Sequence, residues 1–295
     1  MNKAKEKYLN TEFITNEGKK VVIIEYISSL NASIQYEDGL IIRNINVAKL
    51  KKGEVRYPIS NIGKYYYTNQ GYKVKIIEYV NFYNTTIKFN DKSSTILKNV
   101  NLGSLRKGAV VNPYHPSVFG VGYCGEGTYI SNISSKVTKS WKAMLGRCYY
   151  YKENPTYKDV TVCEEWHNFQ NFAEWFEQNY NSETMQGWHL DKDILVKGNK
   201  IYSPVTCCFV PQEINNQFTI DKERVLPKGV SLDRKSIRAT ISKFGKYQLI
   251  GYFSTINEAS EAYKKERLSY IKELSEKWKS QITENVYNIL INYEL

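Results

Sequence analysis

An internal repeat in the first 113 residues constrains this fold more than any other feature. The run GKKVVIIEYISSLNASIQYEDG, which begins at Gly18, returns as GYKVKIIEYVNFYNTTIKFND from Gly71, an offset of 53 residues. LKKGEVRYP at 50–58 then returns as LRKGAVVNP at 105–113, so the second copy is two residues longer. The chain is therefore expected to build one small structural unit twice.

Each copy predicts a set of short β-strands. Apolar and polar residues alternate in SIQYEDG and TIKFND, and Gly, Asn and Asp separate the runs. A unit of this length with four or five short strands suggests an SH3-like barrel, a scaffold that binds peptides, nucleic acids or other proteins. We predict one repeat at 1–62 and the second at 63–127, which ends in the Pro- and Gly-rich NPYHPSVFGVGYCGEG.

The charge is unevenly distributed. The formal net charge of +11 favours a polyanionic partner and excludes a mimic of DNA. Residues 1–115 hold 18 Lys/Arg against 9 Asp/Glu, residues 116–221 hold 9 against 12, and residues 222–295 hold 14 against 9. Basic ends thus flank a mildly acidic middle. The lysines of the repeats could face DNA, or they could keep short edge strands soluble.

Two further patterns bear on localisation. MNKAKEKYLN has no apolar core of a signal peptide, and no run approaches the roughly 18 apolar residues of a membrane helix. The five cysteines are an odd number without regular spacing, which does not predict a disulfide framework. We therefore expect a cytoplasmic protein with no membrane partner.

The pattern changes in residues 128–222. Two amphipathic helices are predicted, one from Ser134 and one over 163–180, whose aromatic residues recur every three or four positions as a core face does. LDKDILVKGNKIYSPVTCCFVPQEINN at 190–216 then predicts strand, turn, strand and helix.

The order of WKAMLGRCY, VCEEWHNFQNFAEWF, LDKDI and YSPVTCCFVPQEINN resembles proteins related to the HNH endonucleases. In that family a histidine on the first strand acts as general base and nearby ligands hold one divalent metal. The matching dipeptide here is Asp191-Lys192, and no histidine follows His189, which precedes the predicted strand. Lysine is a poor base at neutral pH. We therefore predict a degenerate module with no catalytic residue, no cofactor and no enzymatic activity.

Two metal sites are nevertheless conceivable. Asp191 and Asp193 would share one face of a strand and could hold Mg²⁺, or they could be surface charges paired with lysines. A zinc site could draw on a second set of residues, although these include no C-x-x-C pair and buried cysteines are usually core residues: Cys148, Cys163, His167, Cys207 and Cys208.

Residues 223–295 predict three short strands followed by a long helix with a capping box at Thr255 and Glu258. GV at 229–230, ATI at 239–241 and GYF at 251–253 resemble an AP2-type domain, which implies a sheet laid in the major groove of DNA. Residues that would then contact DNA, unless they form only a basic solvated face, are these: Arg234, Lys235, Arg238, Lys243 and Lys246.

The predicted helix continues almost to the last residue. An apolar stripe along this extension predicts packing on a partner chain or on another domain, and we expect self-association or a protein partner. The stripe comprises Tyr270, Leu274, Trp278, Ile282 and Tyr287.

The whole chain, an α+β protein by these predictions, resembles in length, order of parts and composition the phage anti-defence proteins that block Gabija, a bacterial DNA-cleaving immune complex. The resemblance implies a non-catalytic protein in the host cytoplasm that binds the host defence nuclease complex and blocks its DNA binding or cleavage. The alternative hypothesis is a phage protein of HNH/AP2 type that binds double-stranded DNA, including a homing-type endonuclease.

Overall fold

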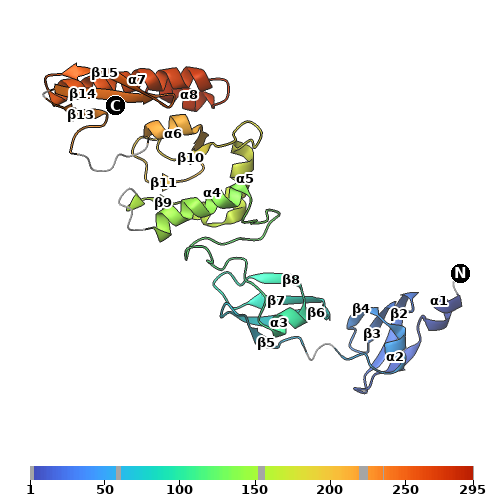
Figure 1. The fold of residues 1–295 in the computed structure, drawn as a ribbon. Helices are drawn as coiled ribbons and strands as arrows, with labels where there is room; N and C mark the ends of the chain where they lie inside the picture. Colours follow the sequence, from blue (N-terminus) through green and yellow to red (C-terminus); the bar gives the residue numbers. More distant parts are fainter. Residues whose placement is uncertain (1–2, 58–60, 152–156, 219–224, 235, 295) are drawn as a thin grey trace. The chain divides into compact units, whose positions relative to one another are not determined.

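The computed structural model describes residues 3–57, 61–151, 157–218, 225–234 and 236–294. The chain forms two compact units, Met1–Asn112 and Pro113–Leu295. Helices and small antiparallel sheets occur in both, so the α+β class is confirmed (Figure 1). No helix in the described parts of the chain has the length and apolar content that crossing a bilayer requires.

The first unit contains two copies of one four-stranded antiparallel sheet, each followed by a short helix. The first repeat, residues 11–57, has strand order β1-β2-β3-β4; the second repeat, residues 64–112, has order β5-β6-β7-β8. The elements are α1 (Lys3–Tyr8), β1 (Glu12–Ile14), β2 (Lys20–Ser28), β3 (Asn31–Tyr36), β4 (Ile41–Ile45), α2 (Val47–Lys51), β5 (Tyr65–Tyr67), β6 (Lys73–Asn81), β7 (Asn84–Phe89), β8 (Ile96–Val100) and α3 (Leu102–Arg106).

The two sheets have the same register. Ile23 pairs with Ile34 in the first repeat as Ile76 pairs with Ile87 in the second, and a bulge follows at the same place. The glutamate at each bulge accepts a hydroxyl hydrogen bond, from Ser33 at 2.8 Å and from Thr86 at 2.9 Å. The predicted repeat is therefore confirmed, down to the polar contact that closes each bulge.

Each repeat has its own apolar core, formed by the inward residues of β2, β3, β6 and β7 with the short helices. Leu50 and Leu105, one from each helix, are almost completely buried. Asn46 and Asn101 cap these helices by accepting backbone N–H bonds, which satisfies donors that such short helices would otherwise leave free.

A glycine ends each short helix in the left-handed region, at Gly53 and Gly108, both with φ of +69°. A Cβ atom on Gly108 would lie 2.6 Å from the side-chain oxygen of Asn69 and 3.0 Å from the carbonyl oxygen of Tyr67. Gly71 has φ of +85°, yet a Cβ there would meet no atom within 4 Å. A side chain at Gly71 would therefore meet backbone strain alone, whereas one at Gly108 would meet backbone strain and a steric clash.

We predict that Gly108→Ala destabilises the second repeat by about 2–4 kcal/mol, because left-handed strain and a clash add. Gly71→Ala, which has the strain alone, should cost roughly 1 kcal/mol. Amide hydrogen exchange of peptides within 73–89 in the full chain measures both. Equal effects would contradict the steric part of this explanation.

In the second unit, the central module (residues 113–218) packs aromatic side chains around two helices. Trp141 of α4 is fully buried and donates to the carbonyl oxygen of Trp166 at 2.7 Å. Residues 113–127, which are predicted to belong to the second repeat, are part of this second unit. Tyr123 forms a parallel β-bridge with Asn168. The elements are α4 (Lys136–Leu145), a π-helix (Gly146–Tyr150), β9 (Thr161–Val162), a 3₁₀ helix (Glu164–His167), α5 (Phe169–Asn179), β10 (His189–Asp191), β11 (Ile201–Tyr202), β12 (Cys208–Val210) and α6 (Gln212–Phe218).

The C-terminal module (residues 225–294) is the three-stranded sheet β13-β14-β15 covered on one face by α7. The capping box at Thr255 and Glu258 is present, as predicted. The prediction of one uninterrupted helix is wrong, because α7 ends at Trp278 and a second helix starts after its N-cap, Thr283. The elements are β13 (Val230–Asp233), β14 (Ser236–Lys243), β15 (Lys246–Phe253), α7 (Ile256–Trp278) and α8 (Glu284–Ile291).

Candidate functional site

The segment after β10 is turned by a buried carboxylate. Asp191 Oδ1 accepts the backbone N–H groups of Asp193 at 2.7 Å and Ile194 at 2.8 Å. These bonds take the chain out of the strand immediately after Asp191, so Asp191 and Asp193 do not share a strand face as predicted. Burial raises the pKa of Asp191, against the opposing effect of its two backbone hydrogen bonds.

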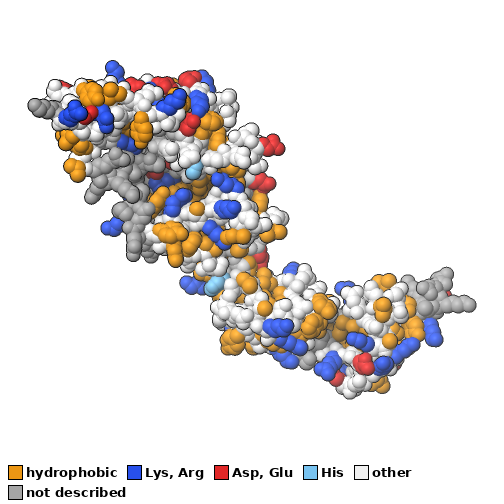
Figure 2. All heavy atoms as spheres, viewed as in Figure 1, with side chains coloured by type: hydrophobic (Ala, Val, Ile, Leu, Met, Phe, Trp, Pro, Cys, Tyr) orange, Lys and Arg blue, Asp and Glu red, His pale blue; other side chains and the backbone are white. Residues whose placement is uncertain are grey.

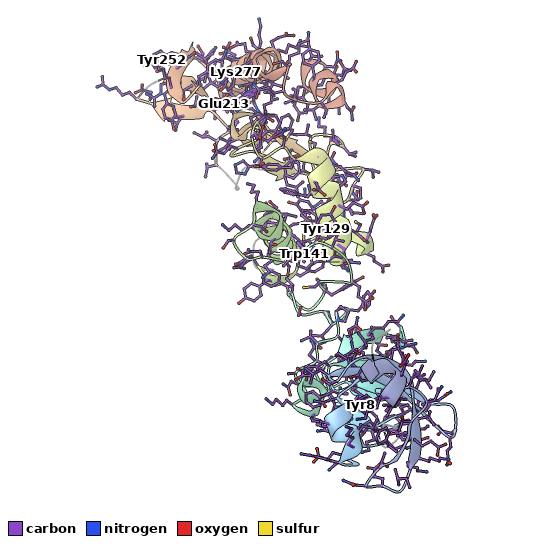
Figure 3. The ribbon with its side chains drawn as sticks, turned by 90° about the vertical axis from the view of Figure 1, so that its right-hand side faces the viewer. Tyr8, Tyr129, Trp141, Glu213, Tyr252 and Lys277 are labelled. Carbon is purple, nitrogen blue, oxygen red and sulfur yellow. The ribbon has the colours of Figure 1, made fainter. Side chains whose placement is uncertain are left out.

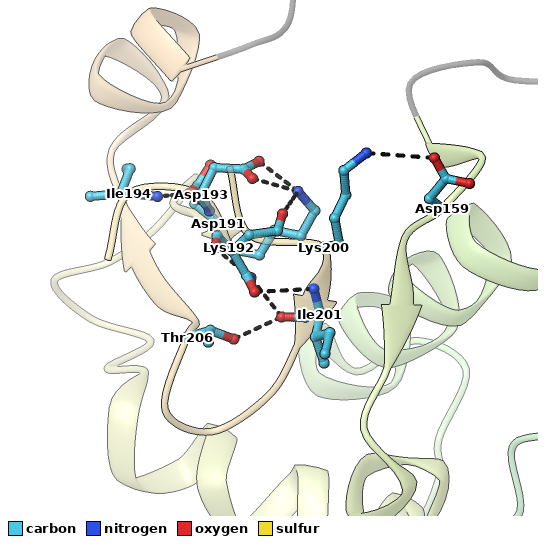
Figure 4. A network of polar contacts seen from close by, with 9 residues as sticks. Asp159, Asp191, Lys192, Asp193, Ile194, Lys200, Ile201 and Thr206 are labelled. Atoms are coloured by element: carbon cyan, nitrogen blue, oxygen red, sulfur yellow. Dashed lines mark hydrogen bonds and ion pairs between the residues drawn. The ribbon is translucent and has the colours of Figure 1, made fainter. Parts of the chain in front are cut away.

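Lys192 occupies the position where the resemblance implies a histidine. Its ammonium group is buried and donates to both carboxylate oxygens of Asp193, at 2.6 and 2.7 Å, and to the carbonyl oxygen of Asn199 at 3.1 Å (Figure 4). Asn199 in return donates to the carbonyl oxygens of Lys192 and Ile201. Lys192 therefore holds the 193–199 loop together, and all its donors are used within the loop.

A pocket of about 290 Å³ opens beside this network. Arg147 lies within it, with its guanidinium 5.5 Å from the ring centre of Tyr202. The Nε atom of Arg147 is buried and has no hydrogen-bond partner among the described residues. The other lining residues are Tyr157, His189, Leu190, Asp191, Lys192, Asp193, Asn215 and Phe218.

His189 is a pocket residue that the sequence predicts to lie before the strand, outside the candidate site. The structure makes it the first residue of β10, paired with Val210, and it lines the pocket. Burial, together with the positive charges of Lys136 and Arg147, lowers the pKa of His189. The imidazole is thus neutral near pH 7. Among the described bases of this pocket, His189 is the one whose side chain is not engaged by another protein group. The carboxylates of Asp191 and Asp193 already bind protein groups.

The predicted metal ligands do not converge. Within the described ranges, no three His, Cys, Asp or Glu side chains lie close enough together to share an ion. Cys148 and Cys207 are buried, and burial raises their thiol pKa values to about 11 and about 12. His167 instead contacts the Tyr149 hydroxyl at 3.1 Å. Cys148 and Cys207 thus belong to the apolar core, and Cys163 and Cys208 pack against it.

The predicted DNA-contacting residues separate onto different faces of the C-terminal sheet. Arg238 lies on the face away from α7, 3.9 Å from Asp233, and Arg234 and Lys246 lie exposed at the strand ends. Lys243 faces α7, where it is buried against Glu266 at 2.6 Å and Glu273 at 2.8 Å. The prediction for Lys243 is therefore wrong, because strand alternation puts it on the side of Ala239 and Ile241. Lys235 lies outside the described residues.

Large apolar and aromatic side chains occupy the outer face of this sheet instead. Tyr252 pairs across the strands with Arg238, Leu249 with Thr240, and Tyr247 with Ser242. Tyr247 is 88% exposed, and Leu249 and Tyr252 are each 56% exposed. We call Arg238, Tyr247, Leu249 and Tyr252 the outer sheet patch. Period-two alternation in KYQLIGYF could have placed Tyr247 and Leu249 on one face, but not Tyr252, which reaches that face through the register shift between Ala239 and Thr240.

The apolar stripe is predicted to pack on a partner chain or on another domain, and it packs within the chain. Tyr270, Leu274 and Ile282 are buried in the core shared with the central module, so packing on another domain is confirmed and their assignment to a partner contact is corrected. Trp278 packs edge-on against Trp188, with ring centres 6.0 Å apart, and donates to Glu213. Figure 3 shows Glu213 of α6 beside Lys277 of α7, an ion pair of 2.6 Å. The Tyr287 hydroxyl donates to Glu276.

We predict that Asp191→Asn stabilises the second unit increasingly as pH rises from about 4, the ordinary pKa of an aspartate, towards 7. The raised pKa means that the unfolded chain releases this proton first, so ionisation of Asp191 costs folding free energy at higher pH. Asparagine can accept the same two backbone bonds without charge.

Urea unfolding followed by tryptophan fluorescence measures this effect, because all five tryptophans lie in the second unit. A pH-independent difference between the two proteins would contradict the assignment. So would a Mg²⁺-dependent stabilisation of the original chain that Asp191→Asn removes.

A scan against protein-family models and searches of curated proteins and of solved structures found no match for this chain.

Proposed function

We propose that this chain is a non-catalytic binding protein that attaches to a host anti-phage nuclease complex and blocks its binding or cleavage of DNA. On this proposal its modules are two SH3-like repeats, a degenerate HNH-like module and an AP2-like sheet that binds a protein partner instead of DNA. The outer sheet patch carries the proposal. The target, a complex of the Gabija type in the host cytoplasm, comes from the resemblance of the whole chain.

The composition of the outer sheet patch supports a protein partner. Tyrosine and arginine are the residues that most often anchor protein interfaces. Here the exposed Tyr252 lies opposite Arg238, whose charge is shared with Asp233, and Leu249 and Tyr247 follow on the same face of β15. A sheet that neutralises phosphates needs several free cations on one face. Lys243 is instead engaged by two glutamates on the opposite face, and Arg234 and Lys246 lie at the strand ends. The patch therefore favours a protein surface over double-stranded DNA.

The site at β10 supports the absence of catalysis. A hydrolytic HNH-type site needs a metal between free carboxylates and a base. Asp191 is occupied by two backbone N–H groups and Asp193 by Lys192. His189 alone would remain, and a base without a metal leaves the departing oxygen unstabilised.

The first prediction concerns the patch. The purified chain should co-elute with a purified Gabija-type nuclease complex on a sizing column, and Tyr247→Ala with Tyr252→Ala should abolish this. Interface anchors of this kind contribute about 2 kcal/mol or more each. Tyr150→Ala, which removes a tyrosine that is 65% exposed elsewhere in the same unit, is the matched control. Co-elution that survives the double substitution would remove the patch as the interface.

The second prediction concerns catalysis. The purified chain with Mg²⁺ or Mn²⁺ should nick supercoiled plasmid no faster than the His189→Ala and Asp191→Ala variants do. Metal-dependent nicking that both substitutions abolish would establish the chain as a nuclease and favour the homing-type hypothesis.

A further inference from the structure

The two repeats provide an internal comparison, because their separate cores are built from corresponding residues while their surfaces differ. Inward residues correspond in pairs at the same registers, such as Val21 with Val74 and Tyr36 with Phe89. Both repeats bury these residues almost completely. Folding therefore constrains the two copies equally, and differences outside the core reflect something other than the fold.

Charge is the first difference. The first repeat holds seven Lys/Arg against six Asp/Glu, whereas the second holds eight against two. Both acidic residues of the second repeat are engaged: Glu78 accepts from Thr86, and Asp91 accepts from Thr95 and Asn112. Lysine and arginine thus outnumber the acidic residues by six in the second repeat and by one in the first.

The outer face of the second sheet concentrates this charge. Strand pairing aligns Tyr65, Lys75, Lys88 and Ile96 in one row across all four strands, since directly paired residues share a face. A second row holds Tyr67 opposite Lys73. On the face that Figure 2 shows, Lys and Arg side chains lie beside hydrophobic ones over the second repeat.

The same two rows in the first repeat hold different residues. Glu12, Val22, Gln35 and Ile41 form the long row, and Ile14 lies opposite Lys20. Lys20 is paired with Glu12 at 2.8 Å. At these six matched positions, all of which the structure describes, the first repeat has one neutralised lysine. The second has three lysines, two tyrosines and no carboxylate.

The tyrosines are on the edge strand β5, beside the lysines of the neighbouring strand β6. The Lys73 ammonium lies 4.4 Å from the ring centre of Tyr65, and that of Lys75 lies 5.7 Å away. Tyr65 and Tyr67 are 54% and 66% exposed, so both rings are largely open to solvent. Exposed aromatic rings flanked by cations can stack on bases while the cations neutralise phosphates.

We propose that the outer face of the second repeat, comprising Tyr65, Tyr67, Lys73, Lys75 and Lys88, binds single-stranded nucleic acid. Base faces in a duplex are hidden within the stack, so only an unpaired strand can use the tyrosine rings as well as the lysines. An acidic peptide would use the lysines and leave the rings without a matching partner. This activity is separate from the proposed attachment to a nuclease complex.

The test is fluorescence anisotropy of labelled 20-nucleotide probes titrated with the full chain, from about 50 to 200 mM salt. Oligo-dT and oligo-U report single strands of each sugar type, and a mixed-sequence duplex reports double-stranded DNA. We expect both single strands to bind at least about tenfold more tightly than the duplex, since stacking adds to phosphate contact. Tighter binding of oligo-U or oligo-dT then identifies the natural strand.

The decisive variant gives the second repeat the residues of the first: Tyr65→Glu, Lys75→Val and Lys88→Gln. These residues occupy the same registers in the first repeat, so the sheet should still form, which circular dichroism and hydrogen exchange can verify. The swapped variant lowers the net charge by three units, and the matched control lowers it by the same amount in the first repeat: Arg43→Gln, Lys49→Gln and Lys52→Gln. We expect the first variant to lose single-strand binding by more than about a hundredfold and the control to lose severalfold at most.

A milder variant, Tyr65→Leu with Tyr67→Leu, keeps every charge. It should weaken single-strand binding by about five- to hundredfold per ring and leave the salt slope unchanged, because only stacking is lost. Equal losses in the swapped variant and in its matched control would overturn the proposal in favour of general attraction by net charge. Duplex binding as tight as single-strand binding, or no binding at the lowest salt, would overturn it as well.

Discussion

The second unit depends on one helix that closes two cores. The first half of α7 lies on the C-terminal sheet, where Ala259 packs with Val230 and Ala239. Its second half places Tyr270, Ile271 and Leu274 in the core of the central module. The backbone at Gly229 lies so close to the Tyr263 ring that a Cβ there would meet it at 2.0 Å. Burial on both sides of the helix thus joins the sheet and the central module into one unit.

This arrangement decides which surfaces remain for a partner. Because α7 covers one face of the sheet, Lys243 is drawn into an ion-pair cluster, and Tyr247, Leu249 and Tyr252 are left on the other face. The apolar stripe that predicted self-association instead packs against the central module. At this contact Trp278 lies against Trp188, and Lys277 pairs with Glu213. The outer sheet patch then remains as the large exposed apolar surface of the described part of this sheet. In the first unit the two repeats have separate cores of matching residues, and their surfaces distinguish them.

The parts of the fold that depend on local patterns could be predicted from the sequence. The repeat followed from matched residues, and the aromatic face of α5 and the capping box at Thr255 followed from their spacing. The end of β10 could not be predicted, since it depends on the Asp191 carboxylate turning back onto two backbone N–H groups. The break after Trp278 contains no glycine or proline, and only the N-cap at Thr283 signalled it.

The candidate sites were less predictable than the fold because their chemistry depends on distant partners. Lys243 meets carboxylates on α7, which lies beyond the following strand, and no window around Lys243 reveals them. His189 is predicted to precede the strand, because LDKDIL predicts a strand that starts at Leu190. The difference between the two repeats was visible in the sequence, but the rows of tyrosine and lysine required the strand registers.

We propose that the outer sheet patch, and not the pocket at β10, meets a protein partner. Hydrogen exchange of the chain alone and in complex with a purified Gabija-type nuclease distinguishes the two surfaces. We expect new protection in peptides from β14 and β15, with little change over 189–202. Protection confined to 189–202, with β14 and β15 unaffected, would contradict it.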